Sequence, residues 1–284
     1  LEDAPEAGTT VRAALSELLP QERLSQLLAG GHLTESMLRS LMDLMEGGGA
    51  ERLLQVLIHS ELKSVRRHVF DVLVDMGPSV IDDALTHLDD PRWFVQRNML
   101  ALLQRLGSLP EDFDPARFLD HEDARVRREA LPLALQQRDR RPRTLVTALR
   151  DNDSHIVRIA LLALHRHTPD AAVPTLVHRV VSNDELPDDL RVLGITLVGK
   201  TGSPLALTAL VKLVTAGRTF FGRRKLAKSS PAVIAAIQAL ARHWPEERST
   251  RQVLDLAAKS KDPELRESAW KTRKRASSTR EKGE

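Results

Sequence analysis

The feature that most limits the fold of this chain is a short pattern that recurs about every 31 residues. Stretches such as "SVRRHVFDVLVDMG", "FVQRNMLALLQRLG" and "IVRIALLALHRHT" each contain an aliphatic residue followed by Arg or Gln. This aliphatic residue is position zero of each unit, and it is Val65, Val95, Val126, Val157 and Leu190 in five consecutive units. Self-similarity at such a period indicates one supersecondary unit that is stacked many times.

Each unit has the pattern of two helices, A and then B. Positions 0, +4 and +7 of the longer segment are mostly apolar, which places them on one face of a B helix. Position +12 is glycine in three units, as expected for a helix C-terminus. A shorter apolar segment such as "ERLLQVLIH" precedes each B helix. Leu38, Val233 and Leu265 mark further units in the same register.

The fold class expected from this pattern is all-α, an α–α superhelix. We expect a right-handed solenoid of about seven antiparallel helix pairs over residues 13–276. Residues 1–12 and 277–284 are polar and are expected to be flexible segments at the two ends.

One stretch, "GITLVGKTG" at residues 194–202, satisfies the G-x-x-x-x-G-K-[ST] pattern of phosphate-binding loops. In the repeat register, however, Gly194 is position +4 of a B helix and Gly199 is position +9. Backbone N–H groups inside a helix are already hydrogen-bonded and cannot cradle a phosphate. We therefore expect a helix here and no nucleotide site.

The repeated helix pair with D-x-x-x-x-x-V-R before its second helix resembles the HEAT repeat family, over roughly residues 34–275. The resemblance implies an α-solenoid in which Asp and Arg side chains form a ladder between adjacent repeats. The ladder residues are Asp89, Asp120, Asp151, Asp184, Arg66, Arg127, Arg158 and Arg191. It also implies a concave face of B helices that binds partners, often within a larger protein.

Positions +2, +6 and +9 of the B helices are expected to point away from the buried seam. They begin basic and become small and apolar along the chain. The candidate partner-binding residues are Arg67, Arg97, Arg128, Leu135, Ile159, Ala163, Val192 and Thr196. Two interpretations stay open: an exposed strip on which a partner docks, or B helices that bury one another.

A longer connection at residues 216–230 interrupts the repeat period. Its cations have no acidic neighbour and are Arg218, Arg223, Arg224, Lys225 and Lys228. Such a basic loop with two phenylalanines can bind phosphates or acidic peptides, or its charges can be merely solvated. Ser230 and Pro231 predict the start of the next helix.

Enzymes with HEAT-like repeats were weighed as alternatives. Deoxyhypusine hydroxylases hold two irons with several His-Glu dipeptides, and this chain has one, His121-Glu122. HEAT-like DNA glycosylases use converging tryptophans, whereas Trp93 stands several units away from Trp244 and Trp270, and the register marks Trp270 as a packing residue. We therefore expect no catalytic activity, no cofactor and no metal site.

We therefore expect a HEAT-repeat scaffold or adaptor that binds a protein partner on its concave B-helix face. The alternative is a nucleic-acid-binding solenoid, because the chain is mildly basic, with a net charge of +3. The absence of cysteine fits a cytoplasmic location, and no apolar run is long enough to span a membrane.

Overall fold

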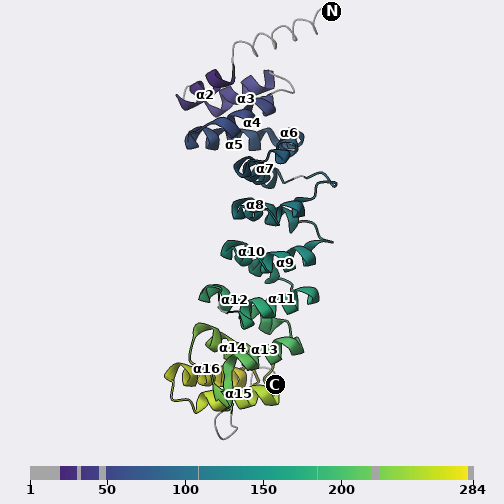
Figure 1. Ribbon diagram of the computed structural model, residues 1–284. Coiled ribbons are helices and arrows are strands. Elements are labelled where there is room, and N and C mark those ends of the chain that lie inside the picture. Colours follow the sequence, from purple (N-terminus) through teal and green to yellow (C-terminus); the bar gives the residue numbers. More distant parts are fainter. Residues whose placement is uncertain are drawn as a thin grey trace, which may run out of the picture. The chain divides into compact units, whose positions relative to one another are not determined.

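The computed structural model describes residues 20–30, 33–44, 49–107, 109–183, 185–218 and 224–280 (Figure 1). Its contacts divide the chain into two compact units, Leu1–Leu133 and Ala134–Glu284, which are described separately. In both units almost all regular structure is helical, and short connections join helices that pack as antiparallel pairs. The predicted fold class, all-α of the α–α superhelix type, is confirmed.

The N-terminal unit contains four long helices and several short ones. Its elements are α2 (Gln21–Ala29), α3 (Glu35–Leu44), α4 (Gly49–His59), α5 (Lys63–Met76), η1 (Gly77–Val80), α6 (Ile81–Thr86), η2 (His87–Asp89), α7 (Trp93–Leu106), η3 (Pro115–Phe118) and α8 (Ala124–Ala134). Helices α5, α7 and α8 are the B helices of consecutive repeats.

The C-terminal unit continues the same alternation. Its elements are α9 (Arg141–Leu149), α10 (Ser154–Leu164), η4 (Asp170–Ala172), α11 (Val173–Val177), η5 (His178–Ser182), α12 (Asp188–Lys200), α13 (Pro204–Val214), β1 (Thr215–Arg218), β2 (Arg224–Leu226), α14 (Pro231–His243), α15 (Arg248–Ala258) and α16 (Pro263–Arg280). The B helices α10, α12, α14 and α16 pack against one another in that order. In Figure 1, α10 and α12 lie on one side of this unit and the A helices α9 and α11 lie on the other.

The hydrophobic core follows the predicted register. Position zero is at most 4% exposed in every unit, from Leu38 to Leu265. The described residues at +4 and +7 are buried as well, including Val69 and Leu102. Each unit thus buries one stripe of its B helix, and stacking neighbours complete the core that one helix pair alone cannot close.

The predicted glycine ends of the B helices are confirmed. Gly77, Gly107 and Gly202 have φ angles of 72°, 76° and 64°, a region that residues with a Cβ rarely adopt.

The two predicted terminal segments differ in outcome. Helix α16 runs to Arg280, so residues 277–280, which were expected to be flexible, are helical. Residues 1–12 lie outside the described residues.

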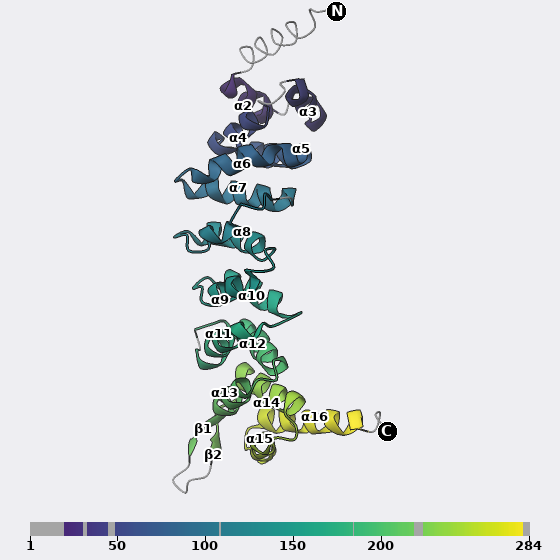
Figure 2. The ribbon, with the colours of Figure 1, turned by 90° about the vertical axis from the view of Figure 1, so that its right-hand side faces the viewer.

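The connection at 216–230 differs from the predicted loop. β1 and β2 pair antiparallel between α13 and α14, and Figure 2 shows this hairpin leading away from α13. β2 also contacts α15, so the insertion packs against its own unit. The predicted helix start after it is confirmed, because the Ser230 side chain accepts a hydrogen bond from the backbone N–H of Val233.

The phosphate-loop pattern lies within helix α12, as the register predicted. A methyl group added at Gly194 would lie 2.8 Å from Cβ of Val180. One added at Gly199 would lie 2.9 Å from Cβ of Ala239. Both glycines therefore stand where α12 approaches a neighbouring segment too closely for any side chain, and helix packing accounts for both of them.

Candidate functional site

The exposed face of the B helices in the C-terminal unit is the candidate functional surface. Arg158 Nη2 in α10 lies 2.6 Å from Asp189 Oδ2 in the first turn of α12. At the other end of α12, Gly199 packs against His243 in the last turn of α14. The three helices are therefore parallel, and their C-terminal ends lie along one edge of the unit.

That edge carries one exposed cation from each of the three helices. Arg166 follows the last turn of α10, Lys200 ends α12, and Arg242 lies in the last turn of α14. They occupy positions +9, +10 and +9 of their repeats. None of the three makes a hydrogen bond through its side chain or an ion pair with any residue that the structure describes. We call these three residues the cation row.

The electrostatic effect of the row is visible at the half-buried His243. Burial lowers the pKa of this imidazole, and the charges of Arg242 and Lys200 lower it further. No acidic group is among the causes of this shift. The edge is thus locally positive, and the dipoles of the three helix C-termini stabilise the cations without neutralising them.

Two large apolar side chains are exposed on B helices of the same unit, both at position +5. Leu162 of α10 is 58% exposed and Trp270 of α16 is 62% exposed. The corresponding residues Leu100, Leu131 and Ile195 are fully buried. The prediction that Trp270 is a packing residue is wrong, because more than half of its surface is exposed.

The predicted apolar strip is only partly exposed. Leu135 is buried, at 8% exposure, so its assignment to a docking surface is wrong. Ile159, Ala163 and Val192 are half-buried, because neighbouring B helices cover part of each. Thr196 is exposed, and its hydroxyl donates to the carbonyl oxygen of Val192 at 2.9 Å. Both sequence interpretations thus hold in part, since the helices bury much of one another.

The basic positions predicted in the N-terminal unit are less available than the cation row. Arg67 and Arg97 are exposed and Arg128 is half-buried. Arg97 Nε lies 3.5 Å from Glu129 Oε1, which links α7 to α8. Arg97 therefore has an acidic neighbour, unlike the three residues of the cation row.

The conserved-looking Arg at position +1 makes contacts that differ from the predicted ladder. Arg66 and Arg127 each donate to two backbone carbonyl oxygens in the loop before their own helix, at 2.7 to 2.9 Å. Arg158 pairs with Asp189, and Arg191 donates to a carbonyl oxygen of η5. The predicted Asp–Arg ladder is therefore wrong at Arg66. The physical reason is that carbonyls at the end of an A helix lack helical partners and a guanidinium can satisfy two of them. Arg158 does pair with an aspartate of the next repeat, but this is Asp189 and not one of the predicted ladder residues.

The contacts of the predicted ladder carboxylates differ from one repeat to the next. Asp89 is exposed and lies 3.5 Å from Arg117, and Asp120 is exposed. The carboxylate of Asp151 accepts a hydrogen bond from the backbone N–H two residues later. Asp184 lies outside the described residues.

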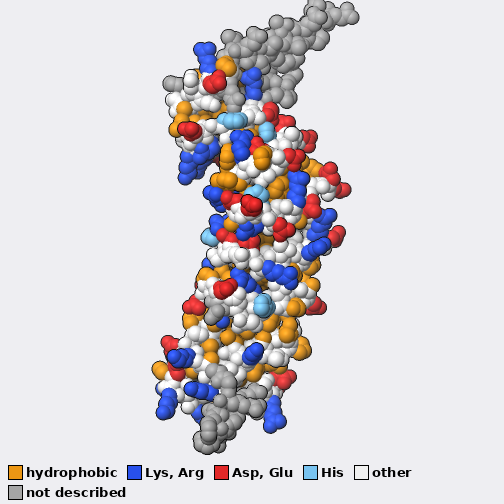
Figure 3. Space-filling model, viewed as in Figure 1, with side chains coloured by type: hydrophobic (Ala, Val, Ile, Leu, Met, Phe, Trp, Pro, Cys, Tyr) orange, Lys and Arg blue, Asp and Glu red, His pale blue; other side chains and the backbone are white. Residues whose placement is uncertain are grey.

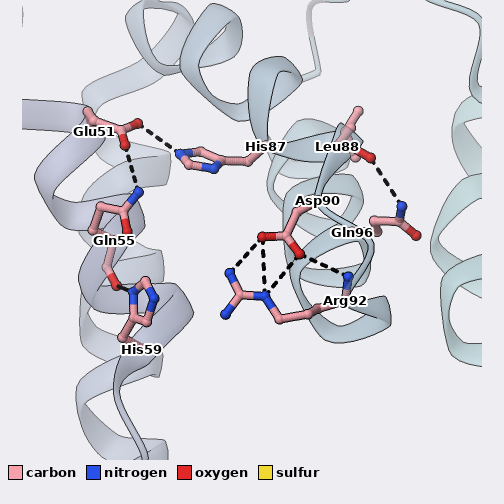
Figure 4. Close-up of polar contacts among 8 residues, drawn as sticks. All are labelled: Glu51, Gln55, His59, His87, Leu88, Asp90, Arg92 and Gln96. Atoms are coloured by element: carbon pink, nitrogen blue, oxygen red, sulfur yellow. Dashed lines mark hydrogen bonds and ion pairs between the residues drawn. The ribbon is translucent and has the colours of Figure 1, made fainter.

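One pair of side chains that the sequence did not single out links two repeats of the N-terminal unit, and Gln96 makes a contact within its own repeat (Figure 4). His87 Nε2 lies 2.8 Å from Glu51 Oε2, which joins the loop of η2 to α4. Gln96, at position +1 of α7, donates to the carbonyl oxygen of Leu88 at 3.2 Å, in place of the usual arginine. The signal for the Gln96 contact was present in the repeat register, whereas nothing in the spacing marked the pair of Glu51 and His87.

Two Asp-x-Arg pairs stabilise the starts of B helices. Asp90 accepts hydrogen bonds from the backbone and guanidinium of Arg92, and Asp123 does the same for Arg125. The arginine hydrogen bonds hold the pKa of each carboxyl at about 2. Arg125 also lies over the ring of Trp93, 3.4 Å from its centroid, which joins α8 to α7.

Acid should weaken the N-terminal unit through these two carboxyls. Their pKa is lower in the folded than in the unfolded chain, so the stability they add is complete above about pH 4 and is lost as the pH falls towards 2. We expect the double substitution Asp90→Asn/Asp123→Asn to lower stability at pH 6 but to make little difference at pH 2. Urea unfolding at both pH values measures this. Asp83→Asn is the control, because the pKa of Asp83 is raised by burial and by Glu51, and its loss should not destabilise the chain at pH 6.

The predicted basic loop residues lie on or beside the hairpin. Arg218 belongs to β1, and Arg224 and Lys225 belong to β2. Lys225 and Lys228 are exposed, and Arg223 lies outside the described residues. Just after the hairpin, Ser229 Oγ donates to Glu264 Oε2 at 2.6 Å, which fixes this segment to the start of α16.

Two classes of site were searched for over the described part of the chain. In that part, no three His, Asp or Glu side chains lie close enough together to hold a metal ion. No helix within the same ranges combines the length and the apolar character needed to cross a membrane. Figure 3 shows charged side chains of both signs and apolar side chains mixed over the visible face of the C-terminal unit.

Comparison with known proteins gives only distant structural likeness. No protein family model matches the sequence, and no curated protein matches it. Among solved structures, human deoxyhypusine hydroxylase in complex with glycerol is 14% identical, with a TM-score of 0.38, over 95% of this chain and 97% of that one. An engineered protein is 18% identical, with a TM-score of 0.39, over 91% of this chain and 76% of that one.

The prediction that the chain is not an enzyme requires correction. A structure that aligns with nearly the whole chain is that of a hydroxylase, which contradicts a confident assignment to the non-enzymes. At this TM-score the likeness assigns no activity either, and the function has to be argued from the surface itself.

Proposed function

We propose that this protein is a HEAT-type helical-repeat scaffold that binds a protein partner on the exposed B-helix face of its C-terminal unit. The observation that carries the proposal is Leu162, an apolar side chain 58% exposed at a register position that three other repeats bury, at Leu100, Leu131 and Ile195. Large apolar side chains exposed beside unpaired charges are typical of interaction surfaces. The lack of cysteine in all 284 residues supports a reducing compartment, which we take to be the cytoplasm.

Nucleic acid is the alternative partner, favoured by the cation row and the basic hairpin. Three cations on one edge would neutralise about three phosphates, and such binding weakens steeply with salt. We favour a protein because the exposed Leu162 has no counterpart among the groups that bind a phosphate backbone. The nucleic-acid alternative is therefore an outcome of the test.

The test is partner capture with the intact chain and two surface variants. Leu162→Glu and Thr196→Glu change exposed positions on α10 and α12, so both should leave the helical circular dichroism spectrum unchanged. We expect each to reduce recovery of a partner about tenfold or more, as for a central interface position. The partner is identified by mass spectrometry, purified, and its binding is then measured directly.

Leu205→Glu is the matched control, because Leu205 is 47% exposed on the A helix α13. It should capture the partner like the unaltered chain. Equal losses in the control and in the B-face variants would contradict the proposal. Recovery of material that nuclease treatment removes would instead support nucleic-acid binding, which substitution of Arg223, Arg224 and Lys225 would then test.

A further inference from the structure

We propose that the C-terminal unit binds an extended acidic segment of its partner, with carboxylates on the cation row and an apolar residue at each end. This inference rests on the proposed function and specifies the chemistry of the partner. Arg166, Lys200 and Arg242 supply the charges, and Leu162 and Trp270 supply the apolar contacts. All five belong to the consecutive B helices α10, α12, α14 and α16.

The argument from charge starts from the cation row, whose three residues have no acidic partner among the described residues. The three residues of the row are exposed and make no side-chain hydrogen bond or ion pair within the described ranges. Burial lowers the pKa of His243, and the charges of Arg242 and Lys200 lower it further. Lys271 of the same unit, by contrast, pairs with Glu267 at 2.6 Å. An anionic partner would therefore find its complement at this edge.

The argument from distance sets the length of the segment. Adjacent packed helices lie about 8–10 Å apart, so the three steps from α10 to α16 span about 24–30 Å. An extended chain rises about 3.3 Å per residue, so about eight or nine residues connect Leu162 to Trp270. Successive carboxylates two or three residues apart would then meet the cation of each helix in turn.

The argument against a phosphate backbone comes from the exposed apolar side chains. Leu162 of α10 is 58% exposed and Trp270 of α16 is 62% exposed. A nucleic acid would gain from a longer positive track, whereas a peptide gains from alternating charged and apolar contacts.

The experiment measures binding of three fluorescein-labelled probes to the full chain by anisotropy at low and at high salt. The first probe is an acidic peptide of about ten residues with Leu at one end, Phe at the other, and Asp and Glu between them. In the second, Gln and Asn replace every acid. The third is oligothymidylate of similar extended length. We expect the acidic peptide to bind best and to weaken as salt is raised.

The decisive variant is Arg166→Glu/Lys200→Glu/Arg242→Glu. It should weaken binding of the acidic peptide about tenfold or more, since three exposed ion pairs become repulsive. Its matched control is Arg150→Glu/Lys259→Glu/Lys261→Glu, the same charge change at exposed positions near the N-terminal ends of B helices in the same unit. The control should bind within about twofold of the unaltered chain. Leu162→Ser should weaken binding severalfold and leave its salt dependence unchanged.

Three outcomes of the probe measurements would overturn the inference. The first is equal binding of the acidic and the amide peptides. The second is equal weakening by the charge-reversed variants of the cation row and of the control, and the third is preferential binding of oligothymidylate through the row. A purified partner that depends on Leu162 and Thr196 but not on the cation row would also overturn it, while leaving the proposed function intact. A purified partner whose binding depends neither on Leu162 and Thr196 nor on the cation row would contradict both this inference and the proposed function.

Discussion

Replacing Val126 with aspartate should unfold the end of the N-terminal unit. Val126 is position zero of α8 and is fully buried. An aspartate there would have to bury a carboxyl group without a designed partner or break the stacking of α8, at a cost of about 3 kcal/mol or more. We expect the melting temperature to fall by about 10 °C. Thermal denaturation followed by circular dichroism measures this, and hydrogen exchange should place the loss in α7 and α8.

The matched control for that variant is Leu162→Asp. It makes a similar apolar-to-acid change on a B helix, but at a side chain that is 58% exposed. Its melting temperature should stay within about 2 °C of the unaltered chain, since surface substitutions rarely change stability by more than about 0.5 kcal/mol. If Val126→Asp were tolerated as well as this control, the register assigned to the repeats would be wrong.

The core could be predicted from the sequence because each repeat poses the same packing problem. Position zero must be aliphatic in every unit, so its recurrence alone located Val65, Val95 and Val157 in the core. The glycine ends could be predicted for a similar reason, since the backbone at Gly107 adopts φ 76°. Periodic constraints are readable in one sequence because the chain repeats them.

Features that occur once could not be predicted in this way. Leu162 occupies the same register position as the buried Leu131, and only the packing around each helix separates them. The hairpin at 215–226 breaks the period, so the register gave no information about its strands. The Arg at +1 was assigned to a ladder from family resemblance, whereas the local carbonyls at the loop before α5 are closer partners for Arg66.

The candidate surface arises from these departures from the repeat. The register predicted which B-helix positions face outwards, including Thr196, but not which of them lack partners. Arg97 and Lys200 look equivalent as exposed cations in sequence, yet Arg97 has Glu129 beside it. Charge that is left unpaired depends on neighbours in the adjacent repeat, and their side-chain positions are not encoded by spacing alone.

Gly194→Ala is expected to destabilise the C-terminal unit although it improves helix propensity. Alanine is favoured over glycine by about 1 kcal/mol inside a helix. At this position, however, the new methyl group would overlap Cγ1 of Val180 and lie 2.8 Å from its Cβ. Valine is branched at Cβ and cannot rotate out of the way. Overpacking of this kind costs about 1–3 kcal/mol, and we expect a net loss of about 2 kcal/mol in urea unfolding.

The double substitution Gly194→Ala/Val180→Ala decides whether close packing is the cause. Removing the two methyl groups of Val180 relieves the overlap with Cγ1 and leaves only the 2.8 Å contact with Cβ. The double variant should therefore be more stable than the sum of the single losses predicts, by about 1 kcal/mol or more. Lys200→Ala changes an exposed side chain of the same sequence pattern and should leave stability unchanged. Additive losses would show that the two sites do not touch. A measurable coupling would mean that the close approach of α12 to η5 requires glycine at position 194, the first glycine of the G-x-x-x-x-G-K-T stretch. A bound nucleotide would then not be needed to explain this glycine.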